Sequence, residues 1–496
     1  MPTTISRKIC QRIVERYVTS RRDLCALSIT NKLLREVTLP FLFRYLRFDG
    51  MLPDPQLIRS DEEEDGIGIG INYDIIFQSL VNNYRRVYKR IEGLKNNSHL
   101  LNYVTGLEIR GWSSLNALMD EDPDICHGPE FCLVQDSWMT AYDILGGLIR
   151  DDLPSLETLS IIFSPISRAL QHTFYLSRRL EKIFLYGCQI DLTPSTIRRP
   201  QILTRLKDLT YEYDPRYPKK IAPSSFRQLL SRSLPTLSSL TFPMECIVQV
   251  TALICGNTPA HFLNHLTITE AKFCPMDSTK AEALYELLDS CNKLKKLVVL
   301  GWMDDALPDL ADHIPPGLVT AAGTVSFVRT VISDRPISSI HFKYCPLDPI
   351  LPSSFILDQP STAMVRKVSL DCSSLLRPDI LQALSQAFPH IQFLTLLFVR
   401  GYRGERCSAI SDLWYPLRTS FYHLQVYHVL DVYSPRTDID RAFTKENVEC
   451  PIGRRNEPRE RRHPSLKEIR LLSRFTWLWF KDEGWTCHEF PDEKFI

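Results

Sequence analysis

Residues 263–268 read LNHLTI and residues 294–299 read LKKLVV, and this arrangement of apolar residues returns along most of the chain. Each copy has an apolar residue, two variable residues, a second apolar residue, one variable residue and a third apolar residue. The copies begin at Val104, Leu156, Leu180, Leu206, Leu237, Leu263, Leu294, Ile337, Val365, Ile391, Leu424 and Leu466. Most successive copies begin 24 to 33 residues apart, and three intervals are longer, at 52, 43 and 42 residues.

The spacing inside each copy predicts a strand, because apolar residues separated by one variable residue lie on the same face of a strand. Segments with helical periodicity lie between these strands, at residues 138–148, 224–230, 279–291 and 379–388. Thr279 and Glu282 have the spacing of a capping box and predict the start of the third helix. Parallel strands need a crossover connection, and a helix is the usual one. A strand and a helix that return at such intervals are typical of a leucine-rich-repeat solenoid.

We therefore expect residues 101–480 to form an α/β solenoid, a horseshoe with parallel strands inside and helices outside. The interval of 52 residues predicts one degenerate repeat near Phe131 to Leu133. The interval of 43 residues predicts a loop insertion after Leu300, and the interval of 42 residues predicts another over residues 436–464. The second insertion is basic between Arg454 and Arg462. We interpret it as a solvated loop, with a nuclear-import signal or a nucleic-acid contact as the alternatives.

The composition restricts the compartment and the partners. Lys and Arg number 59 and Asp and Glu number 58, so the net charge of +1 gives no general attraction to nucleic acid or acidic lipid. The 14 cysteines include no CxxC pair, and several lie beside apolar strands, among them Cys188, Cys274, Cys345 and Cys372, which predicts buried reduced thiols. No apolar stretch is long enough to cross a bilayer, and charged residues interrupt the N-terminus where a signal peptide would lie. We expect a soluble protein of the cytoplasm or nucleus.

Residues 1–48 do not follow the repeat. Ile9 and Ile13 are four residues apart and predict a short amphipathic helix, and Asp23 predicts the N-cap of a second helix. The segment resembles an F-box. The matching residues are Ile9, Ile13, Asp23, Leu24, Leu27, Ser28, Asn31, Lys32, Arg35, Leu39, Pro40, Leu42, Arg44 and Leu46. The sequence departs from the family pattern where Ile5-Ser6 replaces the opening Leu-Pro, where Lys8 replaces an acidic residue and where Leu34 replaces an aromatic residue.

The resemblance implies that residues 1–48 bind a Skp-type adaptor and, through it, a cullin. The adaptor-binding residues would be Ile9, Ile13, Leu24, Leu27, Leu34, Pro40 and Leu42. The alternative is that these helices only cap the solenoid, because the ends of a solenoid need a cover. Residues 49–100 are interpreted as a linker with an acidic and glycine-rich loop at residues 61–70 and a helix over residues 74–94. Residues 481–496 are interpreted as a C-terminal tail.

The sequence offers little for catalysis. It has no nucleophile elbow, no HExxH motif and no phosphate-binding lysine motif. Cys126, His127 and Cys132 lack a second pair of metal ligands, and no base can be assigned to Cys487 and His488. We therefore expect no enzymatic activity, no metal and no cofactor.

Binding is the more informative prediction. Residues that alternate with the buried strand residues face the inside of the solenoid, and in the later repeats they become apolar. We predict that a target protein binds there, at Trp302, Phe393, Leu397, Val426, His428 and Leu430. The alternative is that loops, or the tail from Trp485 to Ile496, cover these residues. Together with the F-box resemblance, this predicts a non-catalytic substrate receptor of a ubiquitin ligase, with a ligase-independent scaffold as the second hypothesis.

Overall fold

The structure is a computed structural model of the 496-residue chain. The residues that it describes are 7–18, 21–50, 73–112, 140–149, 153–164, 166, 170, 179–188, 205–212, 223–257, 262–269, 277–300, 309–332, 335–343, 364–372, 378–398, 417, 420–431, 463, 465–471, 475–480 and 484–489. The chain divides into two compact units, Met1–Leu253 and Ile254–Ile496.

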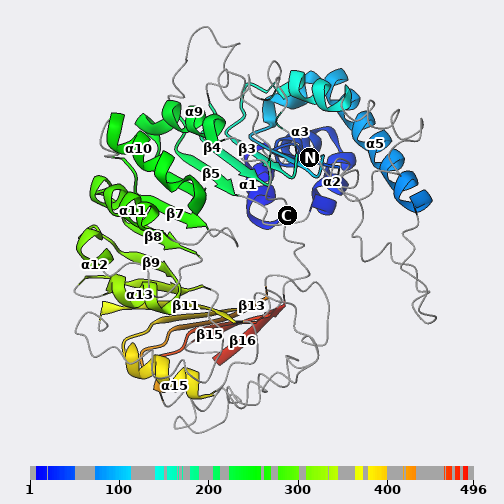
Figure 1. Ribbon diagram of the computed structural model, residues 1–496. Coiled ribbons are helices and arrows are strands. Elements are labelled where there is room, and N and C mark those ends of the chain that lie inside the picture. Colours follow the sequence, from blue (N-terminus) through cyan, green and yellow to red (C-terminus); the bar gives the residue numbers. More distant parts are fainter. Residues whose placement is uncertain are drawn as a thin grey trace, which may run out of the picture. The chain divides into compact units, whose positions relative to one another are not determined.

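The first unit contains a sheet of parallel strands, each followed by a return segment. In order, the strands are β1 (Tyr45–Asp49), β2 (Gly106–Arg110), β3 (Thr158–Ile162), β4 (Lys182–Tyr186), β5 (Asp208–Glu212) and β6 (Ser239–Pro243). The helices are α1 (Arg7–Tyr17), α2 (Arg21–Thr30), α3 (Lys32–Leu42), α5 (Tyr73–Asn96), the 3-10 helices η2 (Ser98–Tyr103), η5 (Leu234–Thr236) and η6 (Met244–Cys246), and α9 (Pro223–Ser233). Helix α10 (Ile247–Asn257) begins in this unit and ends in the second (Figure 1).

The second unit repeats the arrangement. Its strands are β7 (His265–Thr269), β8 (Lys296–Val299), β9 (Thr320–Gly323), β10 (Ser339–Phe342), β11 (Lys367–Cys372), β12 (Phe393–Phe398), β13 (Val426–Asp431), β14 (Glu468–Leu471), β15 (Phe475–Phe480) and β16 (Gly484–Glu489). Strands β7 to β14 are parallel, and β15 and β16 are antiparallel. Figure 1 shows α11 (Ser278–Ser290), α12 (Leu310–His313) and α13 (Val325–Ile332) along one side of β7, β8 and β9. Helix α15 (Pro378–Ala387) lies between β11 and β12 in the sequence.

The predicted repeat residues form the core of both units. Every one of them whose side chain is described is buried, from Val104, Leu107 and Ile109 at β2 to Leu466 and Ile469 at β14. The register aligns them in rows, so that Leu107 of β2 pairs with Leu159 of β3. Each row buries apolar surface against the repeat before it and the repeat after it. The predicted fold class, an α/β repeat solenoid with parallel strands and helices beside them, is confirmed.

The backbone repeats as regularly as the core. At the start of most of the parallel strands, one carbonyl oxygen accepts two successive amides of the following repeat. The oxygen of Glu157 accepts the amides of Glu181 and Lys182 at 2.8 and 3.0 Å. The oxygen of Arg366 accepts those of Gln392 and Phe393 at 2.7 and 3.0 Å. This pattern satisfies the polar groups where each chain segment enters the sheet, and it holds neighbouring repeats in register.

The helices lie close to the positions predicted from the sequence, but two of their N-terminal caps differ from the predicted ones. The predicted helices at residues 224–230, 279–291 and 379–388 correspond to α9, α11 and α15, and the linker helix predicted over residues 74–94 is α5. The predicted cap of α11 is wrong, because Asp277 accepts the amide of Lys280 at 2.9 Å and begins the helix before Thr279. The predicted cap of α2 is also wrong, since this helix begins at Arg21 and Asp23 lies within its first turn.

Besides the antiparallel strands β15 and β16, two parallel strands are absent from the predicted set. Strand β1 carries buried Leu46 and Phe48, so the repeat begins inside the segment that was assigned to the F-box-like helices. Strand β9 lies within the interval of 43 residues, with buried Ala321 at its centre. The loop insertion predicted after Leu300 is therefore wrong for residues 309–332, which form one more short repeat of α12, β9 and α13.

The longest interval lies between two strands that are neighbours in the sheet. Strand β2 pairs directly with β3, with Gly106 opposite Thr158. The degenerate repeat predicted near Phe131 to Leu133 falls on residues outside the described ones and stays a prediction. Strand β13 likewise pairs directly with β14 across the interval that contains residues 436–464. The basic residues Arg454 to Arg462 also lie outside the described part.

Candidate protein-binding surfaces

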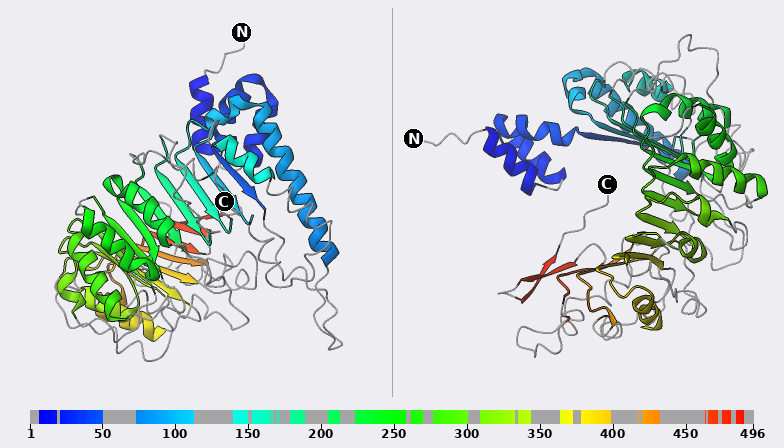
Figure 2. Two further views of the ribbon diagram at one scale, coloured as in Figure 1. Left: turned by 45° about the horizontal axis from the view of Figure 1, so that its top comes forward. Right: turned by 90° about the vertical axis from the view of Figure 1, so that its left-hand side faces the viewer.

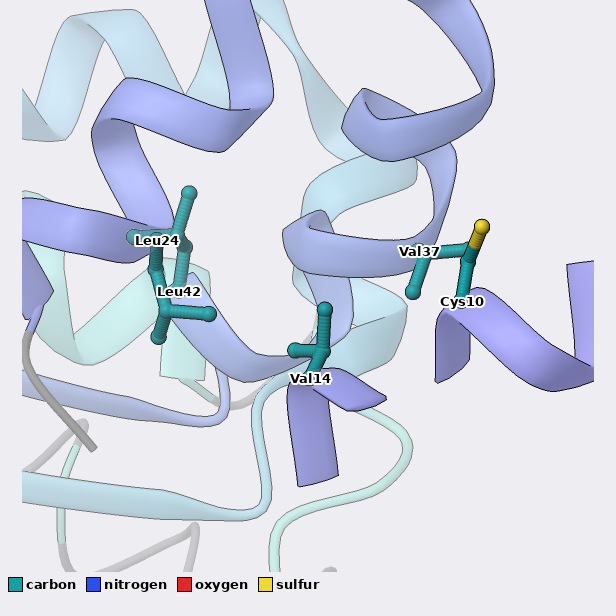
Figure 3. Close-up of a cluster of buried hydrophobic side chains, with 5 residues drawn as sticks. All are labelled: Cys10, Val14, Leu24, Val37 and Leu42. Carbon is teal, nitrogen blue, oxygen red and sulfur yellow. The ribbon is translucent and has the colours of Figure 1, made fainter. Parts of the chain in front are cut away.

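The N-terminal helices have a core of their own. Side chains of Cys10, Val14, Leu24, Val37 and Leu42, drawn from α1, α2 and α3, are buried together (Figure 3). The three helices are the dark-blue group in Figure 2. Asn31 separates α2 from α3, because its side chain accepts the amide of Leu34 at 2.8 Å and caps α3. Residues 7–42 thus form a packed helical segment, which we call the helical segment.

Helix α1 has apolar residues on two sides. Cys10 and Val14 point into the core of the helical segment, whereas the side chains of Ile9 and Ile13 are 52% and 47% exposed. The isoleucines, which the sequence alone marks as the apolar side of this helix, therefore take no part in the core. An isoleucine pair one turn apart on an exposed helix face is suited to burial against a partner.

The other predicted adaptor-binding residues divide by burial. Leu24 and Leu42 are buried in the core, and Leu27, Leu34 and Pro40 are half-buried beside it. Substitutions of Leu24 or Leu42 would therefore disturb the fold of the helical segment before they disturb any contact. Adaptor binding through these residues stays a prediction.

Sequence reasoning missed one exposed apolar residue of the helical segment. Ile29 of α2 is 86% exposed. Helical periodicity could have identified Ile29. It lies five residues after Leu24, which corresponds to a rotation of about 140° around the helix axis and places Ile29 on the side of α2 away from the core. Ile29 adds a third isoleucine to the exposed apolar surface of this segment.

The helical segment joins the sheet through a short connection. Helix α3 ends at Leu42 and β1 begins at Tyr45. Phe48 of β1 accepts a hydrogen bond at its backbone oxygen from Nε1 of Trp112 at 3.3 Å, and the guanidinium of Arg90 lies 5.2 Å from the Phe48 ring centroid. The first strand is therefore fixed to the repeats that follow it.

A second candidate surface is formed by strand residues that alternate with the core residues, and we call it the open face of each unit. In the second unit, Phe393 of β12 pairs in register with Val426 of β13, and Leu397 pairs with Leu430. Phe393 is 39% exposed, and Leu397 and Val426 are half-buried. The register thus brings five of the six predicted target-binding residues onto two neighbouring strands, the fifth being His428. Trp302 and the side chain of Leu430 lie outside the described residues, and target binding stays a prediction.

Charged residues surround this apolar group. His428 Nε2 lies 2.9 Å from Oε1 of Glu468 on β14. On β10 and β11, the buried carboxylate of Asp371 lies 2.6 Å from Nε2 of His341 and 3.5 Å from Nζ of Lys343. The open face of the second unit therefore combines an exposed aromatic ring with ion pairs, a mixture that is common in protein interfaces.

The C-terminal residues continue the sheet where the structure describes them. Residues 475–480 and 484–489 form β15 and β16, with Trp477 opposite Cys487. Residues 484–489 therefore pair as a strand with β15, and the alternative in which loops or residues 485–496 cover the open face stays a prediction. The boundary predicted at residue 481 separates two strands of one hairpin.

The described residues contain no cluster of side chains placed to bind a metal ion. No group of three His, Cys, Asp or Glu side chains among them is placed to hold a metal ion. Burial raises the pKa of Cys188 and of Cys291 to about 12, so both thiols stay protonated at neutral pH, as expected of structural cysteines. Cys487 and His488 are successive residues of β16. Cys126, His127, Cys132, Cys274 and Cys345 lie outside the described part, as does the side chain of Cys372.

Two comparisons with known proteins found no counterpart. No protein family matches the sequence, and no curated protein matches it. Among solved structures, the chain is similar to the crystal structure of the Rad7 and Elc1 complex in yeast, with 16% sequence identity and a TM-score of 0.38. The similarity covers 85% of this chain and 96% of the yeast chain. None of the helices in the described parts is both long and apolar enough to span a membrane.

Proposed function

We propose that this chain is a non-catalytic substrate receptor of a Skp-cullin-F-box ubiquitin ligase. The helical segment binds the Skp-type adaptor, and the open face of the second unit holds the target protein. Other subunits transfer ubiquitin, so this chain contributes binding and proximity. The protein then acts in the cytoplasm or the nucleus, where its adaptor is found.

One observation carries the proposal: the helical segment leaves its isoleucines outside its own core. Ile9 and Ile13 are about half exposed, while smaller Cys10 and Val14 fill the interior. An exposed apolar surface on a segment of this size favours burial against a partner. The order of residues from Ile9 to Leu46 resembles an F-box, and this resemblance supports an adaptor as the partner.

The second hypothesis is a ligase-independent scaffold whose helices only cap the solenoid. A cap places its apolar residues toward the repeat that it covers. The exposed isoleucines do not favour that arrangement, because their side chains remain accessible in the complete chain. The half-buried Leu27 and Leu34, by contrast, are compatible with both hypotheses.

The test is a binding measurement between the full chain and a purified Skp-type adaptor. We expect the double variant Ile9→Glu/Ile13→Glu to lose at least tenfold in affinity, about 1.4 kcal/mol, because two charges would have to be buried at the interface. Circular dichroism should show an unchanged fold, since neither side chain belongs to the core. Unchanged affinity in a folded double variant would favour the cap hypothesis.

A matched control is available on the same chain. Met364 is 53% exposed, close to the value for Ile9, and lies in the second unit. Met364→Glu introduces the same kind of charge at a similar exposure, and adaptor affinity should stay at the wild-type value. An equal loss in this control would show that the assay responds to added negative charge and not to the isoleucine face.

The target surface has its own test. Phe393→Asp changes an exposed ring on the open face and should leave both stability and adaptor affinity unchanged. Ubiquitin-dependent turnover of proteins that co-purify with the wild-type chain should be lost in this variant. Turnover that continues at the wild-type rate would exclude Phe393 from target recognition.

A further inference from the structure

Three aromatic rings and one carboxylate meet on the open face of the first unit. Phe184 and Tyr186 lie on β4, Phe163 follows the end of β3, and Glu212 is the last residue of β5. The ring centroids of Phe163 and Tyr186 are 4.9 Å apart in an edge-on arrangement. Those of Phe184 and Tyr186 are 6.5 Å apart with nearly parallel planes. We call these four residues the aromatic–carboxylate cluster.

Phe163 is held in an uncommon backbone conformation. Its φ of 48° lies in the left-handed region that side chains other than glycine rarely adopt, and its amide donates to the oxygen of Tyr186 at 2.8 Å. Backbone strain of this kind costs about 1 kcal/mol or more and is concentrated at functional sites. Here the strained residue is one whose ring rests against Tyr186.

Glu212 differs from Glu108 and Asp49, two other carboxylates of this face. Glu108 lies 3.2 Å from Arg47 and accepts the hydroxyl of Tyr45 at 2.7 Å, and Asp49 lies 2.7 Å from Arg47. Within the described part of the chain, the carboxylate of Glu212 has no ion pair and no hydrogen bond. Burial raises the pKa of this carboxyl group. Loss of water without a compensating cation is costly unless a ligand supplies the cation.

The geometry places the carboxylate beside the rings. Glu212 pairs in register with Tyr186, and both belong to the open face. Lys182 is opposite Asp208 at the other end of the same two strands. Arg110 stands three strands away from Glu212, at about 14 Å for the usual strand separation. Among the described residues, the surroundings of the cluster therefore favour a positive charge.

We propose that the aromatic–carboxylate cluster binds a cationic side chain, lysine or arginine, of a partner polypeptide. Aromatic faces attract a cation through their electron-rich surfaces, and the carboxylate of Glu212 supplies the full charge. The rings also remove water from the aliphatic stem of the bound side chain. This site lies on the first unit and does not depend on adaptor binding, so it adds a recognition point beyond the surface proposed for the target.

The experiment measures saturation-transfer difference spectra of the full chain with small probes. The probes are the acetylated and amidated forms of lysine, trimethyllysine and arginine, together with norleucine as the neutral isostere. We expect saturation of the cationic probes with millimolar dissociation constants and none of norleucine. The lysine and arginine probes distinguish the two possible side chains, and trimethyllysine separates ring contact from hydrogen bonding.

Variants assign the signal to the cluster. Glu212→Gln and Tyr186→Leu should each weaken cation binding by about fivefold to tenfold, as cation–π contacts and paired charges do. Glu181→Gln is the matched control, because Glu181 precedes β4 at the end opposite Tyr186 and pairs with Lys207 at 3.0 Å, and binding should be unchanged. Should Tyr186→Leu unfold the chain, Phe184→Leu replaces it. Equal binding of norleucine, unchanged binding in Glu212→Gln, or no binding of any cation would each overturn the proposal, whatever the outcome of the adaptor test.

Discussion

The side chains of Asp371 and His341 form a hydrogen bond across neighbouring strands of the second unit, with Oδ1 of Asp371 2.6 Å from Nε2 of His341. Asp371 is only 5% exposed, and its other oxygen lies 3.5 Å from Nζ of Lys343. A carboxylate this buried is tolerated because two donors compensate for the loss of water. The group therefore fixes the polar part of the open face beside the predicted target-binding residues.

Replacement of Asp371 should cost stability. We expect Asp371→Ala to lower the free energy of unfolding by about 2 kcal/mol, because His341 and Lys343 both lose their contact with the Asp371 carboxylate. Chemical denaturation of the full chain measures the change. The double variant Asp371→Ala/His341→Ala should recover part of the loss, and additive losses would contradict a direct interaction between the two side chains.

The space around Gly323 is too small for any side chain. A Cβ atom at this position would lie 2.5 Å from Cδ1 of Phe327 and 2.6 Å from the backbone oxygen of Val299. Gly323→Ala should therefore lower the free energy of unfolding by about 2 kcal/mol, as overpacking does. Gly317→Ala is the matched control, since nothing lies within 4 Å of its Cβ position, and thermal melting should show no loss. Equal melting temperatures for the two variants would refute this close packing.

The same glycine explains why the sequence did not reveal β9. The pattern was recognised by large apolar residues, and this repeat carries Ala321 and Gly323 where the others carry leucine, isoleucine, valine, phenylalanine or tyrosine. Small residues are required here because Phe327 of α13 fills the space beside the strand. Strand β1 fits the pattern through Phe43, Leu46 and Phe48, but it overlaps the residues that resemble an F-box.

The candidate surfaces were predictable to different degrees. Strand alternation was sufficient to place Phe393 and Val426 on the open face, because the side-chain period of a strand is fixed. The buried side of α1 could not be predicted from the pattern, because isoleucine is more apolar than cysteine and the pattern therefore favoured Ile9 over Cys10 as the buried residue. The contact of His341 with Asp371 and the position of Glu212 beside Tyr186 depend on which strands are neighbours and in which register. Spacing along the chain alone does not determine either of these.

The two sides of α1 can be separated by mutation. Val14 is buried in the core of the helical segment, and Val14→Ala should lower its stability by about 2 kcal/mol through the cavity that it leaves. Ile13→Ala, on the exposed side, should change stability by less than about 0.5 kcal/mol. Hydrogen exchange of the α1 amides reports both effects. A larger loss for Ile13→Ala than for Val14→Ala would mean that the helix is rotated in solution.

Glu212 should make the stability of the first unit depend on pH. Burial raises the pKa of this carboxyl group above its ordinary value of 4.5, so the folded form holds the proton more strongly than the unfolded form does. The contribution to stability is therefore complete below the unfolded pKa and is lost as the pH rises through the folded pKa. Glu212→Gln removes this titration and should stabilise the protein by about 1 kcal/mol at neutral pH, with a smaller difference near pH 4. Thermal melting at the two pH values measures this difference, and Glu181→Gln, an exposed neighbour, should show none. A variant that is less stable than the wild type at neutral pH would mean that Glu212 is already compensated within the protein and needs no external cation.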